Sequence, residues 1–112
     1  MSSRDVGRGG EEAAVALLLE RGYHIVGRNV RMPGGEIDVV AKDGEVVVFV
    51  EVKARESNRF GSALSAVDAR KRRTLRRLAG EWLQLFAPTS RARFDVVASD
   101  SGRLAHYKDA FQ

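Results

Sequence analysis

The spacing of apolar residues predicts one helix and three strands in the first half of the chain. Alanine and leucine dominate a segment that we expect to be helical over 5–21 and that ends before a glycine. A short strand is predicted over 23–30, which is rich in β-branched and aromatic residues. Strands are also predicted over 36–41 and 45–53, and the Asp-Gly pair between them is a strong hairpin signal.

The second half of the chain predicts a helix followed by two strands. Either Ser65 or Asp68 can cap the helix, which we expect to run to about Ala87, where a proline follows. Strands are predicted over 91–99 and 104–107. The order is therefore α-β-β-β-α-β-β. It predicts an α/β fold in which residues 1–112 form a single domain with a central mixed β-sheet flanked by helices.

The predicted hairpin decides which side chains share a face of the sheet. If Asp43 and Gly44 occupy the turn, Lys42 pairs with Glu45 and Glu36 stands opposite Glu51. Because side chains alternate along a strand, one face carries Glu36, Asp38, Phe49, Glu51 and Lys53. The other face, which we expect to be the buried one, carries Ile37, Val39, Val46, Val48, Val50 and Val52.

This register brings carboxylates and an ammonium group together. Asp38 and Glu51 become diagonal neighbours, roughly 7–8 Å apart, a gap that a cation bound to oxygens of both can fill. Glu36 opposite Glu51 is unfavourable, since like charges across strands repel. A plain alternative is that Glu51 and Lys53 form a surface ion pair, which contributes about 0–1 kcal/mol.

Composition narrows the classes of function. The formal net charge of +4 favours anionic partners such as nucleic acid. The chain has no cysteine, which excludes disulfides, thiolate zinc sites and cysteine catalysis. The first residues lack the apolar region of a signal peptide, and no apolar run approaches the roughly 20 residues of a membrane span. We therefore expect a soluble cytoplasmic protein with no membrane partner.

The residues of the predicted hairpin and its surroundings resemble the YraN family of bacterial proteins. That family is similar to the archaeal Holliday-junction resolvases and to the wider restriction-endonuclease-like superfamily. The resemblance covers about residues 7–97 and continues weakly to 111. The matching segments are Gly10-Glu11, Gly35-Glu36-Ile37-Asp38, Phe49-Val50-Glu51-Val52-Lys53 with Arg55, Phe60-Gly61, Lys71 and Arg93-Phe94-Asp95-Val96-Val97.

The resemblance implies a restriction-endonuclease-like fold and a role for individual residues. Asp38 would be the main ligand of Mg²⁺ or Mn²⁺, and Glu51 a second ligand aided by the backbone carbonyl of Val52. Lys53 would orient or help deprotonate the attacking water. Glu11, which shares a helical face with inward-facing apolar residues, would complete the metal shell, although acidic residues near a helix start also complement the helix dipole.

The predicted second helix carries most of the candidate phosphate-binding residues. One face of this predicted helix carries Val67, Lys71, Leu75, Leu78 and Trp82, all of them apolar except the lysine. Lys71 therefore faces the sheet near the helix start, where it reaches a phosphate or merely extends along apolar surface. Arg70 and Arg73 would contact phosphates non-specifically, or belong to a solvated face. Trp82 is expected in the core, and both histidines are expected to be structural or surface residues. Arg55, in the loop expected after the strand motif, is a further candidate to bind the nucleic acid.

The leading hypothesis is a metal-dependent endonuclease that acts on DNA, including branched or structured DNA. Asp38 and Glu51 would hold the metal and Lys53 would assist. Symmetric cleavage of a junction would need a two-fold homodimer. One alternative is a non-catalytic nucleic-acid-binding module of the same fold. Another is an interaction protein that uses a sheet edge.

Overall fold

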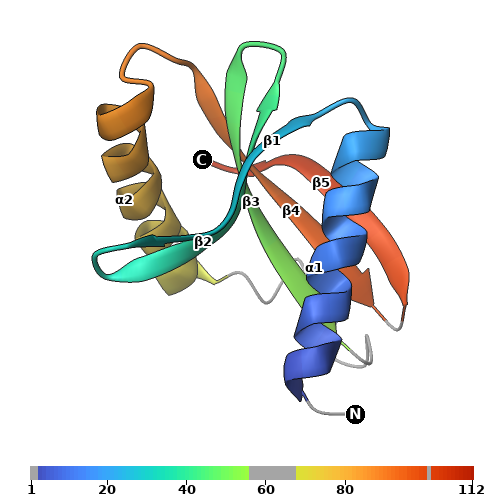
Figure 1. The fold of residues 1–112 in the computed structure, drawn as a ribbon. Helices are drawn as coiled ribbons and strands as arrows, with labels where there is room; N and C mark the ends of the chain where they lie inside the picture. Colours follow the sequence, from blue (N-terminus) through green and yellow to red (C-terminus); the bar gives the residue numbers. More distant parts are fainter. Residues whose placement is uncertain (1–2, 56–67, 101) are drawn as a thin grey trace.

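The computed structural model describes residues 3–55, 68–100 and 102–112, in which the helices and strands follow the predicted order (Figure 1). The elements are α1 (Ser3–Glu20), β1 (His24–Met32), β2 (Gly35–Asp43), β3 (Val46–Arg55), α2 (Ala69–Phe86), β4 (Ala92–Asp100) and β5 (Arg103–Phe111). The α/β class and the element order are confirmed. Most of the strands extend beyond the predicted bounds, and β5 does so most clearly.

The five strands form one mixed sheet in the order β1-β2-β3-β4-β5. Neighbours pair antiparallel except β3 and β4, which are parallel. A parallel pair needs a long crossover connection. Helix α2 lies within that connection, as the predicted strand–helix–strand unit requires. The central strand β3 and its neighbour β4 therefore run in the same direction beside each other.

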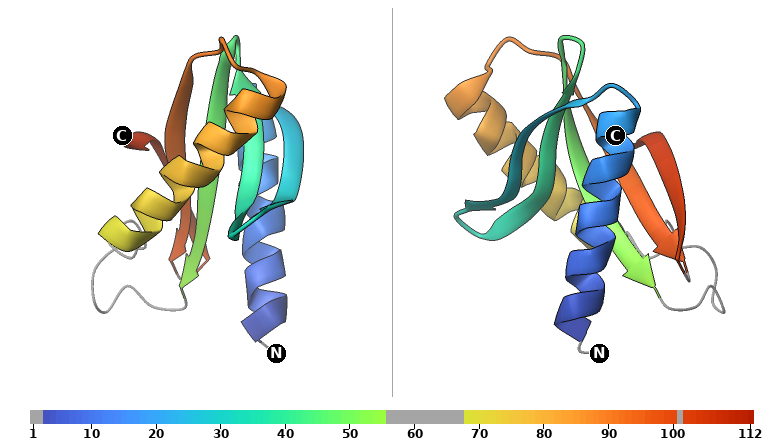
Figure 2. Two further views of the ribbon diagram at one scale, coloured as in Figure 1. Left: turned by 90° about the vertical axis from the view of Figure 1, so that its left-hand side faces the viewer. Right: turned by 45° about the vertical axis from the view of Figure 1, so that its right-hand side comes forward.

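The two helices lie on opposite faces of the sheet (Figure 2). The α1-side cluster consists of Ala14, Leu18, Tyr23, Val39, Ala41, Val48, Val50 and Val97. The α2-side cluster consists of Ile37, Val40, Val47, Phe49, Leu78, Ala79 and Trp82. The prediction of only one buried face was wrong, because α2 also covers the face that carries Phe49. The continuous apolar run of β3 is typical of a strand buried on both faces.

The predicted register of the β2–β3 hairpin was wrong by two residues. Asp43 pairs with Val46, so that Gly44 and Glu45 form the two-residue turn. Gly44 has φ +61°, and a glycine with positive φ at the first turn position suits a type II′ hairpin, whose twist matches that of the strands. Because side chains alternate with a period of two, a shift of two residues leaves Asp38 and Glu51 on one face.

Strand β2 separates from β3 beyond this paired segment. The pairing with β3 covers only the second half of β2, from Val39 onward, whereas the pairing with β1 continues to Gly35. Figure 1 shows the β1–β2 hairpin bending away from β3 toward α2. Ile37 consequently packs in the α2-side cluster and not beside Val39, in contrast to strict alternation. Asp38 lies at the point where the two strands part.

Helix α2 is capped at its start and packs against the sheet along one side. The carboxylate of Asp68 caps its start and accepts a hydrogen bond from the backbone N–H of Lys71 at 2.9 Å. Its buried stripe of Leu75, Leu78 and Trp82 matches the prediction, and Trp82 lies edge-on to Phe49 with ring centroids 5.7 Å apart. Trp82 is thus a core residue, as expected.

Within the described ranges, neither helix is long and apolar enough to cross a membrane.

Candidate metal and nucleic-acid site

Asp38 and Glu51, here called the carboxylate pair, lie at the point where β2 leaves β3. The backbone N–H of Val52 donates a hydrogen bond of 2.8 Å to Oδ2 of Asp38. The side chain of Asp38 therefore bridges to β3 just beyond Val39 and Val50, the last paired residues of the two strands at this end. This bond holds the carboxylate of Asp38 against the strand that carries Glu51, and the predicted approach of the two residues is present.

Glu51 is a buried carboxylate with incomplete hydrogen bonding. The residue is 4% exposed, and its Oε2 has no hydrogen-bond partner among the described residues. Burial first, and the nearby Asp38 carboxylate second, raise the pKa of Glu51 to about 7 against the opposing effect of Lys71 and Lys53. An unsatisfied buried carboxylate is costly, so this position favours a proton or a cation.

Two lysines from different elements approach the same oxygen of Glu51. Lys53 Nζ lies 3.8 Å from Glu51 Oε1, and Lys71 Nζ lies 3.6 Å from it. Lys53 follows Glu51 by two positions on β3 and so lies on the same face. Lys71 enters from the first turn of α2, which confirms that its side chain is directed at the sheet. Both contacts are longer than a hydrogen bond.

The carboxylate pair fits a hard divalent cation with few protein ligands. Within residues 3–55, 68–100 and 102–112, no group of three or more carboxylate or imidazole side chains is gathered closely enough to hold a metal ion, so the pair offers two carboxylates at most. Mg²⁺ characteristically uses one or two carboxylates and keeps several waters or substrate phosphates. The orphaned Oε2 of Glu51 gives such an ion an available ligand. The carbonyl of Val52 stays a predicted ligand.

Glu11 lies on α1 and bonds to the edge strand β1. Its Oε1 accepts a hydrogen bond of 2.8 Å from the Asn29 side chain and lies 3.7 Å from Arg28. On β1, Asn29 lies opposite Asp38 of β2, because the residues on either side of the two are paired with each other. Glu11 is therefore turned toward the sheet, as expected. To serve as a metal ligand it would have to exchange its present partners.

The predicted phosphate-binding residues fall at one end of α2 and at the end of β3. Arg70 and Arg73 are exposed, and no ion pair joins them to another described residue. Arg55, expected in a loop, is instead the last residue of β3, and residues 56–64 of that predicted loop lie outside the described residues, as does Val67. The structure thus brings Lys71 to the carboxylate pair and leaves Arg70 and Arg73 open to solvent beside it.

The predicted repulsion between Glu36 and Glu51 does not arise. Glu36 stands opposite Arg31 of β1, because β2 has already separated from β3 at this position. The correction follows from the two-residue change of register. The acidic group at this site is therefore a pair and not a cluster of three.

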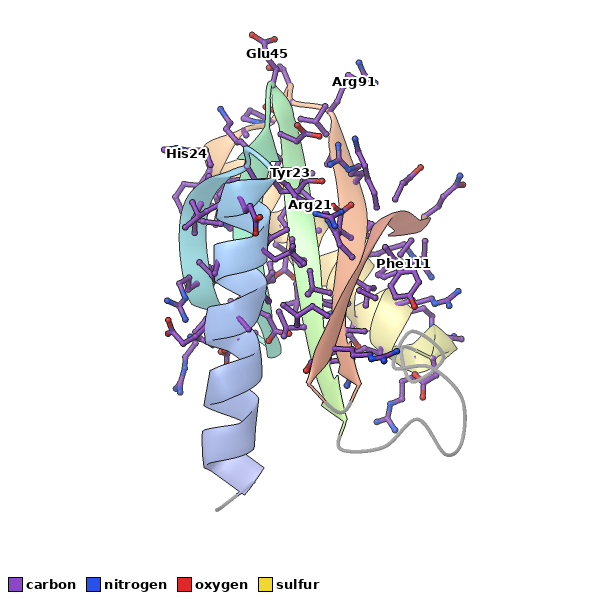
Figure 3. All side chains as sticks on the ribbon, turned by 90° about the vertical axis from the view of Figure 1, so that its right-hand side faces the viewer. Arg21, Tyr23, His24, Glu45, Arg91 and Phe111 are labelled. Carbon is purple, nitrogen blue, oxygen red and sulfur yellow. The ribbon has the colours of Figure 1, made fainter. Side chains whose placement is uncertain are left out.

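A second polar cluster, which the sequence did not predict, lies on the face of the sheet that α1 covers. Its centre is Asp95 of β4, which is fully buried. The hydroxyl of Tyr23 donates to Asp95 Oδ2 at 2.9 Å, and Arg93 Nε donates to Oδ1 at 3.0 Å. Tyr23 follows α1 and is labelled with Arg21 in Figure 3. We call Tyr23, Arg93, Asp95 and His106 the Asp95 network.

His106 completes this network with a defined proton position. Its Nε2 lies 2.8 Å from Asp95 Oδ2, and its Nδ1 lies 3.3 Å from the Arg21 guanidinium. Because a guanidinium group can only donate hydrogen bonds, His106 Nδ1 is the acceptor from Arg21. The ring proton is therefore on Nε2, which donates a hydrogen bond to Asp95. His106 is therefore a structural residue, as expected. The backbone N–H of Asp109 adds a further hydrogen bond of 2.9 Å to Asp95.

The hydrogen bonds outweigh burial in setting the charge of Asp95. Burial by itself would raise the pKa of Asp95, but the bonds from Asp109, His106, Arg93 and Tyr23 together lower it. Burial and the bond to Asp95 raise the pKa of Tyr23 to about 12. The network is thus an ionised aspartate with four donors. One sequence signal was available: an aspartate inside an apolar strand requires buried partners.

Comparison with known proteins gives one family. The sequence model described as "Uncharacterised protein family UPF0102" matches residues 10–98. A UPF0102 protein of Symbiobacterium thermophilum is 50% identical over 101 residues, which cover 89% of this chain and 86% of the relative. A UPF0102 protein of Moorella thermoacetica is 52% identical over 99 residues, 88% of this chain and 82% of the relative. One of Thermodesulfovibrio yellowstonii is 38% identical over 111 residues, 99% of each chain.

Proposed function

On the premise that this chain belongs to the uncharacterised protein family UPF0102, we propose that it is a divalent-metal-dependent endonuclease acting on DNA. UPF0102 is the YraN family that the sequence resembles, so the resemblance is confirmed at the level of family. The observation that carries the proposal is the carboxylate pair, in which the buried Glu51 has an orphaned oxygen and meets Asp38.

The types of residue present at the pair suit phosphodiester hydrolysis. This reaction needs a nucleophilic water, neutralisation of charge that develops on the phosphoryl group, and support for the leaving oxygen. Mg²⁺ or Mn²⁺, when bound, supplies Lewis-acid chemistry for all three. Asp38 and Glu51 would hold the ion, together with the carbonyl of Val52.

The surrounding cations would act on the substrate. The ammonium group of Lys53, 3.8 Å from Glu51, would orient the attacking water and stabilise the negative charge of the phosphoryl group. Arg70 and Arg73, exposed on the first turns of α2, would bind backbone phosphates without reading sequence. The proposed preference for branched DNA rests only on the similarity of the YraN family to the archaeal Holliday-junction resolvases.

The test is a cleavage assay with matched variants. Supercoiled plasmid and a four-way junction are incubated with Mn²⁺ and either the wild type, Asp38→Ala or Lys53→Ala, with Lys42→Ala as control because Lys42 is exposed near the opposite end of β2. We expect both site variants to lose at least about 100-fold in rate and the control to keep its rate. Cleavage that survives Asp38→Ala would refute the assignment of the site.

A second function is favoured by the arginines of α2 alone. Arg70 and Arg73 make no ion pair with another described residue, so they would bind nucleic acid whether or not the pair catalyses hydrolysis. In that case the protein is a non-catalytic nucleic-acid-binding module. Binding of the junction with no cleavage in Mg²⁺ or Mn²⁺ would favour this function.

A further inference from the structure

Glu51 has two ammonium groups within ion-pair distance of one oxygen, and its second oxygen has no hydrogen-bond partner among the described residues. Lys71 and Lys53 lie 3.6 and 3.8 Å from Oε1, whereas Oε2 has no hydrogen bond within the described part of the chain. With Asp38, the group holds two negative and two positive formal charges. The lysines therefore neutralise the carboxylate pair, as a bound divalent cation would.

Lys71 is held in a way that allows its side chain to move. Its backbone N–H is fixed by the Asp68 cap at 2.9 Å, but its side chain is 39% exposed. The ammonium group ends a flexible four-carbon stem. Lys71 directly follows the exposed Arg70 at the start of α2.

We propose that Lys71, with Lys53, is an internal counterion of Glu51 that a nucleic-acid phosphate draws away, so that nucleic acid and a divalent cation bind this protein cooperatively. The inference rests on the proposed function for the identity of both ligands. It deepens that function by assigning Lys71 as a positioning residue, whose effect on the cation passes through Glu51.

The direction of the coupling follows from charge. A divalent cation at the carboxylate pair is repelled by the ammonium groups of Lys71 and Lys53. A phosphate that takes up these groups removes the repulsion, and the cation in turn releases them from Glu51. Because linkage is reciprocal, the cation must strengthen nucleic-acid binding by the same factor that nucleic acid strengthens cation binding.

This direction is opposite to the ordinary effect of divalent cations. Free cations compete for phosphates, so they weaken most electrostatic protein–DNA complexes. A purely structural role for Lys71, in which it neutralises Glu51 permanently, would leave that ordinary weakening in place. Tightening of DNA binding by a cation is therefore a specific sign of the coupling.

The first experiment measures Mn²⁺ affinity without nucleic acid, from the loss of the electron paramagnetic resonance signal of free Mn²⁺. We expect Lys71→Met and Lys71→Gln to bind Mn²⁺ at least about fivefold more tightly than the wild type, because the competing charge is gone. Lys42→Met, which removes one positive charge from the far end of β2, should match the wild type. Unchanged or weaker Mn²⁺ binding in both Lys71 variants, with circular dichroism showing that they are folded, would overturn the inference.

The second experiment measures the affinity of a fluorescein-labelled four-way junction by anisotropy, at constant ionic strength, with and without Ca²⁺. We expect Ca²⁺ to tighten binding by the wild type and by Lys42→Met roughly five- to twentyfold, and to have little or a weakening effect in Lys71→Met. Unchanged or weaker binding by the wild type in Ca²⁺, or no binding at all, would overturn the coupling.

The outcomes separate the inference from the proposed function. Tightening by Ca²⁺ that depends on Lys71, with no cleavage in Mn²⁺, would support the coupling and refute the endonuclease. Cleavage that depends on Asp38, with no effect of Lys71 on either affinity, would support the endonuclease and overturn the coupling alone.

Discussion

The carboxylate of Asp38 meets that of Glu51 at the point where β2 leaves β3, and the bond from Val52 N–H to Asp38 holds it there. Two neighbouring negative groups are unfavourable in a buried position, as the raised pKa of Glu51 indicates. The fold tolerates them because two lysines approach Glu51. This balance between repulsion and neutralisation determines how the protein responds to pH, to cations and to substitution.

The first prediction concerns pH. The folded protein raises the pKa of Glu51 from 4.5 to about 7, so the native state binds this proton more tightly than the unfolded state does. The stability contributed by the protonated form is present below pH 4.5 and is lost as pH rises through about 7. Without divalent cations, we expect the free energy of unfolding of Glu51→Gln to exceed that of the wild type by on the order of 1–3 kcal/mol at pH 8. The difference should be smaller at pH 5.

Urea unfolding at the two pH values measures this difference. Glu45→Gln is the matched control, because Glu45 is exposed at the tip of the β2–β3 hairpin (Figure 3). It should follow the pH dependence of the wild type. A Glu51→Gln protein that is less stable than the wild type at pH 8 would contradict the account of an unfavourably buried carboxylate.

The second prediction concerns the partners of Glu51. Removing the charge of its acidic neighbour in Asp38→Asn should lower the pKa of Glu51, since like-charge repulsion raises it. Removing a cation in Lys71→Met should raise the same pKa, since this lysine lowers it. Carbon-detected NMR titration of the Glu51 carboxyl group measures both. Shifts in the same direction for the two variants would show that one of these contacts is absent in solution.

The sequence predicted the order of elements because periodicity and turn residues are local signals. It also placed Asp38 and Glu51 on one face, and this conclusion survived an error of two residues in register because strand faces alternate with a period of two. The register itself failed because Asp-Gly was read as the complete turn, whereas Gly44 takes its first position. The separation of β2 from β3 depends on packing against α2, which no local pattern encodes.

The Asp95 network lies beyond sequence reasoning for a different reason. Tyr23 is 72 positions from Asp95 along the chain, and only the completed sheet brings it to β4. The β5 side of the network also depends on an irregularity in pairing between Phe94 and Val96, where Asp109 adopts φ +52° and presents its N–H to Asp95. The aspartate could be suspected from its apolar neighbours, but its partners could not.

The third prediction concerns this network. Asp95→Ala leaves Arg93 and three other donors without their acceptor in a buried position, and we expect a loss of about 3–5 kcal/mol of unfolding free energy. Tyr23→Phe removes one hydrogen bond and should cost about 1–2 kcal/mol. The control is Tyr107→Phe, whose hydroxyl makes no side-chain bond with the described residues that surround it, with an effect within about 0.5 kcal/mol.

Chemical denaturation at neutral pH measures these losses, and acid titration adds a second test. The network lowers the pKa of Asp95 in the folded state, so its stabilisation is present above the unfolded value and is lost as pH falls through the folded one. Asp95→Ala should therefore flatten the acid limb of the stability profile. An unchanged acid limb would mean that Asp95 does not titrate as the network requires.

The fourth prediction uses two glycines that differ in the space around them. A methyl group on Gly35, where the β1–β2 hairpin approaches α2, would lie 2.9 Å from Leu78 Cδ1. We expect Gly35→Ala to cost about 1–3 kcal/mol through overpacking. Gly80, within α2, has no neighbour within 4 Å of such a group, and Gly80→Ala should stabilise by about 0.5–1 kcal/mol. Thermal unfolding of the pair measures the contrast, and a stabilised Gly35→Ala would show that the hairpin does not pack on Leu78.

The position of bound Mn²⁺ on the protein shows whether the carboxylate pair is the metal site. Substoichiometric Mn²⁺ is added to isotopically labelled protein, and the paramagnetic broadening of each backbone amide signal is recorded. We expect the amide signals of Asp38, Glu51 and Val52 to broaden first, and Asp38→Asn to abolish the effect. Broadening that starts instead at Glu11 and Glu12, or at Asp43 and Glu45, with the amides of the carboxylate pair unaffected, would contradict this assignment.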